Sequence, residues 1–122
     1  MGGKHTRKLL DVRPWQSAKM DCREGRVAVL GNTLLLSEPL KNLSGNAFKL
    51  YSCMICESGG SKDFEFSRAT GIKYGISYST LTRAIKELVE VGMLKIALSG
   101  KSTRTKNLYS FAWDWKSECD TS

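Results

Sequence analysis

The segment formed by residues 64–98 constrains the fold of this chain more than any other part. It reads FEFSRATGIKYGISYSTLTRAIKELVEVGMLKIAL. Alternating phenylalanines predict a short strand, Ser67 is a suitable N-cap for a short helix, and Gly75 allows a sharp turn. A longer amphipathic helix then ends at Gly92, where a left-handed conformation costs little, and an apolar strand follows over residues 93–98. The segment therefore predicts two helices joined by a tight turn, with a strand behind them.

The second of these helices, about residues 78–91, has one apolar and one polar face. Either Ser77 or Ser79 can act as its N-cap. Its apolar face is predicted to consist of Leu81, Ala84, Ile85 and Leu88, with Ile72 and Ile76 packed beneath it. Its polar face carries Ser79, Thr82, Arg83 and Lys86. The acids Glu87 and Glu90 come only near the end, whereas a merely solvated helix usually places acids first. This order of charges, with bases first and acids last, favours a face that contacts a polyanion. An ordinary solvated face is the alternative.

A basic hairpin is predicted after the helix. Residues 99–107 contain Lys101, Arg104 and Lys106 and no acid. They separate the first strand from a second run of alternating bulky residues, 108–115. Such a loop can contact phosphate or enter a minor groove, and a plain solvated hairpin loop is the alternative.

Two runs in the chain resemble a known family. Residues 79–92 match the S-T-x-x-R-A-(I/L)-K-E-L-x-x-x-G run of winged helix-turn-helix proteins, with the nearest likeness to DNA-binding domains of plasmid replication initiators and phage replication organisers. Residues 43–51 resemble the first-helix segment of these domains. The resemblance covers residues 43–115 and implies an α+β winged helix-turn-helix fold, with a three-helix core and a C-terminal β-hairpin wing.

The resemblance also implies how the domain meets DNA. The second helix is expected to read the major groove and the wing to contact the backbone. Arg83 is the strongest candidate for a guanine contact, and Tyr78, Ser79 and Thr82 for neighbouring base edges or phosphates. The full set of candidate DNA-binding residues is Ser77, Tyr78, Ser79, Thr82, Arg83, Lys86, Lys101, Arg104 and Lys106.

The charge distribution agrees with a nucleic-acid partner. The 122 residues carry a net charge of +7. Between residues 67 and 107 eight bases face two acids, which leaves +6, and residues 1–26 add +4 from seven bases and three acids. The remaining segments are net acidic, so positive charge gathers on the predicted motif and on the N-terminus. We therefore expect binding to double-stranded DNA, in replication initiation or in transcriptional regulation.

Three segments are expected: a basic N-terminal arm (1–25), the winged domain (26–116) and a short tail (117–122). The arm either tracks phosphates or enters the adjacent minor groove, or it is a disordered leader. Its large apolar residues, including Trp15, can instead dock on this domain, on a second subunit in a homodimer, or on another protein. The alternative function is accordingly a protein-interaction module that uses the arm together with Trp113 and Trp115.

Two elements are expected between the arm and the motif. Gly31 and Asn32 separate two apolar runs, so residues 26–36 predict a hairpin, or a strand followed by a turn. Pro39 is expected to start a short helix that runs to about residue 43. Ser44 then caps a helix whose buried stripe is expected to be Ala47, Leu50, Tyr51 and Met54. Phe48 and Ile55 lie off this stripe and either widen the buried face, pack against the N-terminal segment or form a dimer contact.

Other classes of function find little support in the sequence. Cys53 and Cys56 have metal-ligand spacing but fall within a predicted helix, and Cys22 and Cys119 form no second pair, so we expect no metal and no cofactor. The single histidine, His5, lies in the arm, and no glycine-rich phosphate loop follows a strand. We therefore expect that the protein is not an enzyme. No apolar run approaches the ~20 residues of a membrane span, which predicts a cytoplasmic protein without membrane contact.

Overall fold

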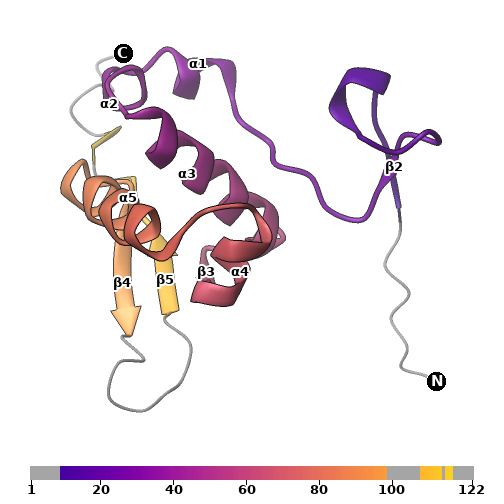
Figure 1. Ribbon diagram of the computed structural model, residues 1–122. Coiled ribbons are helices and arrows are strands. Elements are labelled where there is room, and N and C mark those ends of the chain that lie inside the picture. Colours follow the sequence, from indigo (N-terminus) through magenta and orange to yellow (C-terminus); the bar gives the residue numbers. More distant parts are fainter. Residues whose placement is uncertain (1–8, 99–107, 114, 117–122) are drawn as a thin grey trace.

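The chain folds into an α+β structure. The computed structural model describes residues 9–98, 108–113 and 115–116, and within these ranges it contains five α-helices and two small antiparallel sheets (Figure 1). The predicted wing loop with Lys101, Arg104 and Lys106, the tail and Cys119 lie outside the described residues. In chain order the elements are β1 (Leu10–Asp11), a 3-10 helix (Pro14–Gln16), β2 (Arg23–Glu24), α1 (Asn32–Leu35), α2 (Glu38–Lys41), α3 (Gly45–Ser58), β3 (Asp63–Glu65), α4 (Arg68–Lys73), α5 (Tyr78–Glu90), β4 (Leu94–Leu98) and β5 (Leu108–Phe111).

Helix α3 is the central helix of the core. Ser44 caps it as predicted, since the Ser44 hydroxyl accepts a hydrogen bond from the Ala47 amide at 3.2 Å. Gly59 ends the helix in the left-handed conformation, with φ 62°. The predicted stripe is confirmed, because Ala47, Leu50, Tyr51 and Met54 are all buried. Phe48 and Ile55 are partly buried against the same core, so the wider buried face is confirmed.

The larger sheet has the strand order β3-β5-β4, all antiparallel. Tyr109 of β5 pairs with Phe64 of β3 on one side and with Ile96 of β4 on the other. Strand β5 is therefore the middle strand. Phe64 and Phe111 stack with ring centres 4.6 Å apart. The strand expected over residues 108–115 ends earlier, at Phe111, because its neighbours reach no further: Asp63 and Leu94 are the last residues that pair with it.

Helices α4 and α5 are joined by a tight turn, as the sequence predicts. The Ser67 and Ser77 hydroxyls accept from the amides of Thr70 and Thr80, at 3.1 and 3.4 Å, so each caps its helix. Gly75 has φ 81°, a conformation that glycine adopts at no steric cost. Figure 1 shows α4 and α5 at an angle to one another below α3.

One predicted contact beneath α5 is confirmed and one is wrong. Ile76 is buried in the core, whereas Ile72 is 60% exposed. Gly71 takes the inward position of α4 instead: a Cβ at this glycine would lie 3.3 Å from a Leu81 methyl group. Helix α5 then buries Leu81, Ala84 and Leu88 and stops before Gly92, which has φ 85°.

The prediction of a hairpin or strand over residues 26–36 is wrong. Gly31 has φ −71° and ψ 147° and is the N-cap of α1, so it does not take the positive φ that a two-residue hairpin turn requires. Residues 25–30 form no regular element, and α1 is a single turn. The short helix expected from Pro39 to about residue 43 is present as α2, which begins one residue earlier and ends at Lys41, with Leu40 buried.

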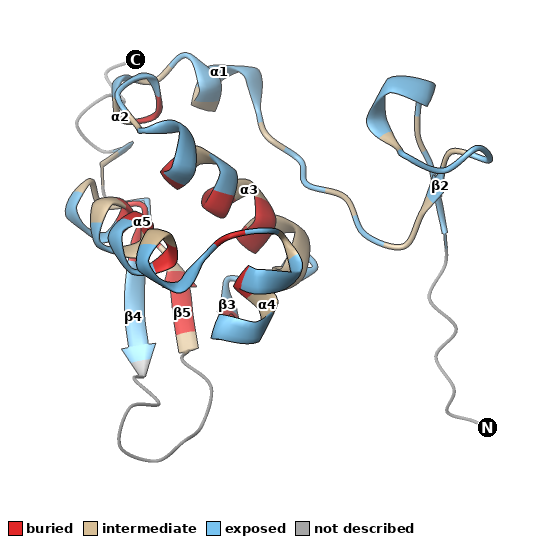
Figure 2. Cartoon of the chain, viewed as in Figure 1, coloured by how far each residue is buried: buried red, intermediate tan, exposed pale blue. Residues whose placement is uncertain are grey.

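The described part of the N-terminal segment forms a small structure of its own. Strands β1 and β2 pair over two residues each, and the 3-10 helix lies between them. Trp15 is 81% and Met20 100% exposed. Figure 2 shows the segment mostly exposed, while buried residues gather where α3, α5 and the larger sheet meet. Among the described residues no helix is long and apolar enough to cross a membrane.

Candidate nucleic-acid interface

The exposed face of α5 brings together six of the predicted site residues. All six are exposed, while the opposite face of the helix is held in the core by Leu81, Ala84 and Leu88. Because the buried face fixes the rotation of the helix, the exposed face has a defined direction. These six residues are Ser77, Tyr78, Ser79, Thr82, Arg83 and Lys86.

The hydroxyl groups of this face do not all remain free. The Ser77 hydroxyl accepts from the Thr80 amide and donates to the Thr80 hydroxyl at 3.0 Å, so it is engaged in the helix cap. The Thr82 hydroxyl donates to the Tyr78 carbonyl oxygen at 3.0 Å and keeps only acceptor capacity for a ligand. Ser77 therefore supports the helix start, and the side chains available as donors are chiefly those of Arg83 and Lys86.

The first carboxylate along α5, that of Glu87, is engaged by the start of α3. Glu87 accepts from the Ser44 amide at 2.8 Å and from the Ser44 hydroxyl at 2.7 Å, at the N-terminal end of α3. The Glu87 carboxylate thus satisfies otherwise unpaired donors at the N-terminal end of α3, where the helix dipole also favours a negative charge. In the described part of the chain neither Arg83 nor Lys86 has an ion-pair partner. The N-terminal half of the exposed face thus carries uncompensated positive charge.

Two basic residues outside the predicted set lie beside this face. The Arg68 guanidinium, on the first residue of α4, lies over the Tyr78 ring with its carbon 4.2 Å from the ring centre. The Lys49 ammonium lies above the turn between α4 and α5, since a Cβ at Gly75 would be 3.8 Å from Lys49 Nζ. The sequence places both residues on helices but gives no signal that Arg68 reaches Tyr78 or that Lys49 reaches the turn at Gly75, because each contact joins two different elements of the fold.

A partly buried carboxylate joins α4 to α3. Glu57 of α3 accepts from Arg26 at 2.8 Å, from Lys73 at 3.0 Å and from the Tyr74 hydroxyl at 2.5 Å. Burial alone would raise the pKa of Glu57, but the hydrogen bonds from Tyr74 and Lys73 and the charges of Lys73 and Arg26 together lower it. Burial and the Glu57 carboxylate raise the pKa of Tyr74. Lys73 is thereby neutralised locally, and it is a weaker phosphate ligand than its place in the motif suggests.

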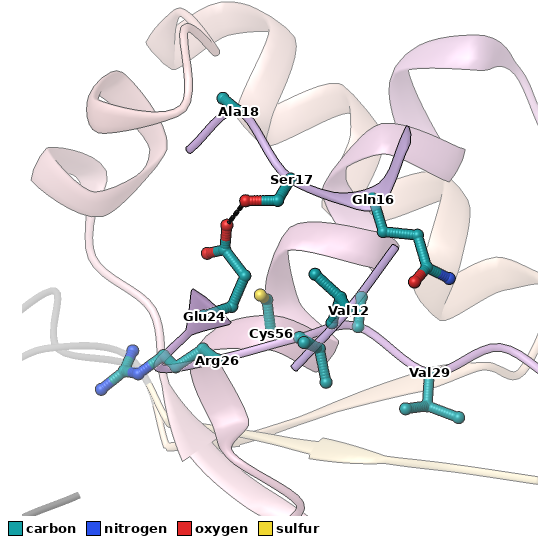
Figure 3. A pocket seen from close by; sticks show the side chains of 10 residues that line it. Val12, Gln16, Ser17, Ala18, Glu24, Arg26, Val29 and Cys56 are labelled. Carbon is teal, nitrogen blue, oxygen red and sulfur yellow. Dashed lines mark hydrogen bonds between the residues drawn. The ribbon is translucent and has the colours of Figure 1, made fainter. Parts of the chain in front are cut away.

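A cavity of about 560 Å³ lies between the N-terminal segment and α3 (Figure 3). Glu24 accepts a hydrogen bond from Ser17 at its rim, and Cys56 reaches it from α3. None of the predicted DNA-binding residues lines it. The remaining lining residues are mostly small and apolar: Val12, Gln16, Ala18, Arg26, Val27, Ala28 and Val29.

The cysteines of α3 have the character of structural thiols. Burial raises the pKa values of Cys53 and Cys56, so both stay protonated near neutral pH. Thiolate is the form that binds metal. Over the residues that the structure describes, no three His, Cys, Asp or Glu side chains are grouped to hold a metal ion.

Comparison of this chain with known families, proteins and structures finds no relative. No family model, curated protein or solved structure matches this chain. The geometry of α4 and α5 and the charges around them are therefore the basis for a functional assignment.

Proposed function

We propose that this chain is a winged helix-turn-helix protein that binds duplex DNA. The order α3–β3–α4–α5–β4–β5, with β5 between the other two strands, supports this fold assignment. The sequence run of α5 resembles the recognition helix of that family and supports it independently. The wing is then the connection between β4 and β5, which carries Lys101, Arg104 and Lys106.

The observation that carries the proposal is the uncompensated basic face of α5. A helix of this size fits the major groove. In a helix-turn-helix the second helix lies in the groove while the first helix, here α4, crosses the DNA backbone. The fork of Arg83 can donate two hydrogen bonds to guanine O6 and N7, with Ser79 and Thr82 at neighbouring base edges or phosphates. Lys86 lies one turn or less from Arg83 and suits a phosphate.

The DNA-binding surface suits two biological roles. Replication initiation and transcriptional regulation both use such a domain, and the surface described above serves either. A homodimer would place two copies of α5 on successive turns of the same groove, about 34–36 Å apart. The same chemistry would then act on a palindromic site.

A protein-interaction module is the second candidate, and the N-terminal segment favours it. In residues 9–30 four bases face three acids, and three of the bases are ion-paired: Lys19 with Asp21 and Arg23 with Asp11 inside the segment, and Arg26 with Glu57 of α3. Exposed apolar side chains such as Trp15 and Met20 remain. That composition suits contact with a protein better than contact with phosphates.

Selection of bound sites from random duplex DNA tests the proposal. We expect an enriched motif whose length reports a monomer or a dimer, and affinity that falls steeply with added salt because bound phosphates release counterions. Absence of enrichment together with salt-independent or undetectable duplex binding would overturn the proposal in favour of the protein module.

A further inference from the structure

The contact between Arg68 and Tyr78 joins the first residues of two consecutive helices. Ser67 caps α4 and Ser77 caps α5, so Arg68 and Tyr78 both hold the first helical position. The guanidinium carbon lies 4.2 Å from the centre of the Tyr78 ring, well within the ~6 Å range of a cation–π contact. Tyr78 is 55% exposed, so the pair lies on the surface and not in the core.

Among the described residues, the Tyr78 ring is the one partner of the Arg68 side chain. A guanidinium that lies over a ring uses its face, whereas its five N–H groups project in its plane. The described residues supply no carboxylate and no hydrogen-bond acceptor to the Arg68 side chain. The ring contact thus favours one placement of the guanidinium, and no described carboxylate or carbonyl competes with a bidentate anion for its N–H groups.

The pair also lies at the end of α5 where DNA contact is proposed. Tyr78 is followed directly by Ser79, and its carbonyl oxygen accepts from Thr82. Any duplex whose major groove receives the start of α5 has a backbone beside that helix, since the groove is only ~12 Å wide. The Arg68 guanidinium is then placed toward a phosphate of that backbone.

We propose that Arg68 and Tyr78 form a phosphate clamp, in which the tyrosine ring positions the guanidinium for a bidentate contact with the DNA backbone. The clamp rests on the proposed DNA-binding function and extends it from α5 to α4. It makes Arg68 a contact residue and Tyr78 a positioning residue. It predicts a sequence-independent contribution, because phosphates carry no base information.

Duplex binding of the full chain, measured by fluorescence anisotropy over a range of salt concentrations, tests the clamp. Arg68→Ala is expected to weaken binding about tenfold on every duplex, the equivalent of ~1.4 kcal/mol, and to lower the salt slope by about one. Arg68→Lys should keep the slope but lose affinity, since an ammonium lacks the planar fork. Tyr78→Ala should lose part of the Arg68 contribution, whereas Tyr78→Phe keeps the ring and should retain that contribution, measured as the effect of Arg68→Ala in each background.

The double variant and a charge-matched control decide the outcome. Arg68→Ala with Tyr78→Ala should cost less than the sum of the single changes, because the two residues act together. Lys62→Ala removes an equal charge from another exposed cation–π contact, to Trp113 at 5.7 Å, and should leave the slope unchanged. An unchanged salt slope in Arg68→Ala, or additive effects of the two changes, would overturn the clamp while Arg83→Ala still alters binding. If the unchanged protein binds no duplex, the proposed function itself fails.

Discussion

Replacement of Glu57 by glutamine is expected to loosen the attachment of α4 to α3. The Glu57 side chain is 14% exposed, whereas its partners Lys73 and Arg26 are 61% and 40% exposed. Glutamine keeps the shape and still offers an acceptor to Tyr74, but the charge is lost. Weakening the Tyr74 hydrogen bond from charged to neutral costs about 1 kcal/mol, and each half-exposed ion pair about 0.5 kcal/mol. The free energy of unfolding should therefore fall by about 2 kcal/mol.

The pH dependence of this loss has a definite sign. The pKa of Glu57 is lower in the folded state than its usual value of 4.5. The carboxylate therefore stabilises the fold fully above its unfolded-state pKa, and this contribution disappears as the pH falls through the lower, folded-state pKa. The difference between the unchanged protein and Glu57→Gln should be largest near neutral pH and should shrink on acidification below about pH 4.5.

Urea unfolding followed by tryptophan fluorescence, at several pH values, measures both quantities. Glu90→Gln is the matched control, because Glu90 is exposed and has no ion pair within the described part of the chain. It should change the free energy of unfolding by less than about 0.5 kcal/mol. A loss of less than about 0.5 kcal/mol in Glu57→Gln near neutral pH, or one that persists in full at about pH 3, would refute the role assigned to this carboxylate.

The other predictions concern the DNA surface and the α3 cap. Arg83→Ala should lose about 1–3 kcal/mol of discrimination at one base pair, which competition between single-base variants of the bound site would measure; an unchanged preference there would count against base readout by this residue. Lys101→Ala with Arg104→Ala should weaken all duplexes about equally and lower the salt slope by about two, and an unaffected slope would mean that this loop does not touch phosphate. Glu87→Ala removes the acceptor of two hydrogen bonds from Ser44 and should lower the free energy of unfolding, measured by urea unfolding, by about 1 kcal/mol. An unchanged free energy would mean that water replaces the carboxylate.

Local signals in the sequence predicted most helix boundaries. Ser44, Ser67 and Ser77 each cap the helix that follows, because the capping bond spans only three residues and needs no tertiary information. Gly75 and Gly92 both have positive φ, as the turn and the helix end require. Alternation of bulky residues likewise predicted β3 and β5, although the end of β5 depends on where its neighbours begin.

Features that depend on contacts between distant residues were not predicted. The Glu57 cluster joins residues 31 and 16 positions apart in the chain, to Arg26 and to Lys73, and no sequence pattern marks such a meeting. The contact of Arg68 with Tyr78 likewise depends on the angle between α4 and α5. The error at Gly31 has a different cause, because Gly-Asn suits a hairpin turn and also the start of a helix, and local sequence does not distinguish them.

An NMR titration of the isotopically labelled protein with its selected duplex shows directly whether α5 is the DNA-binding surface. We expect the largest backbone shifts on residues 78–86 of α5, with a further effect at Arg68 and little change in the indole signals of Trp15 and Trp113. Shifts concentrated on Trp15, Trp113 and the N-terminal segment, with α5 unaffected, would contradict this assignment.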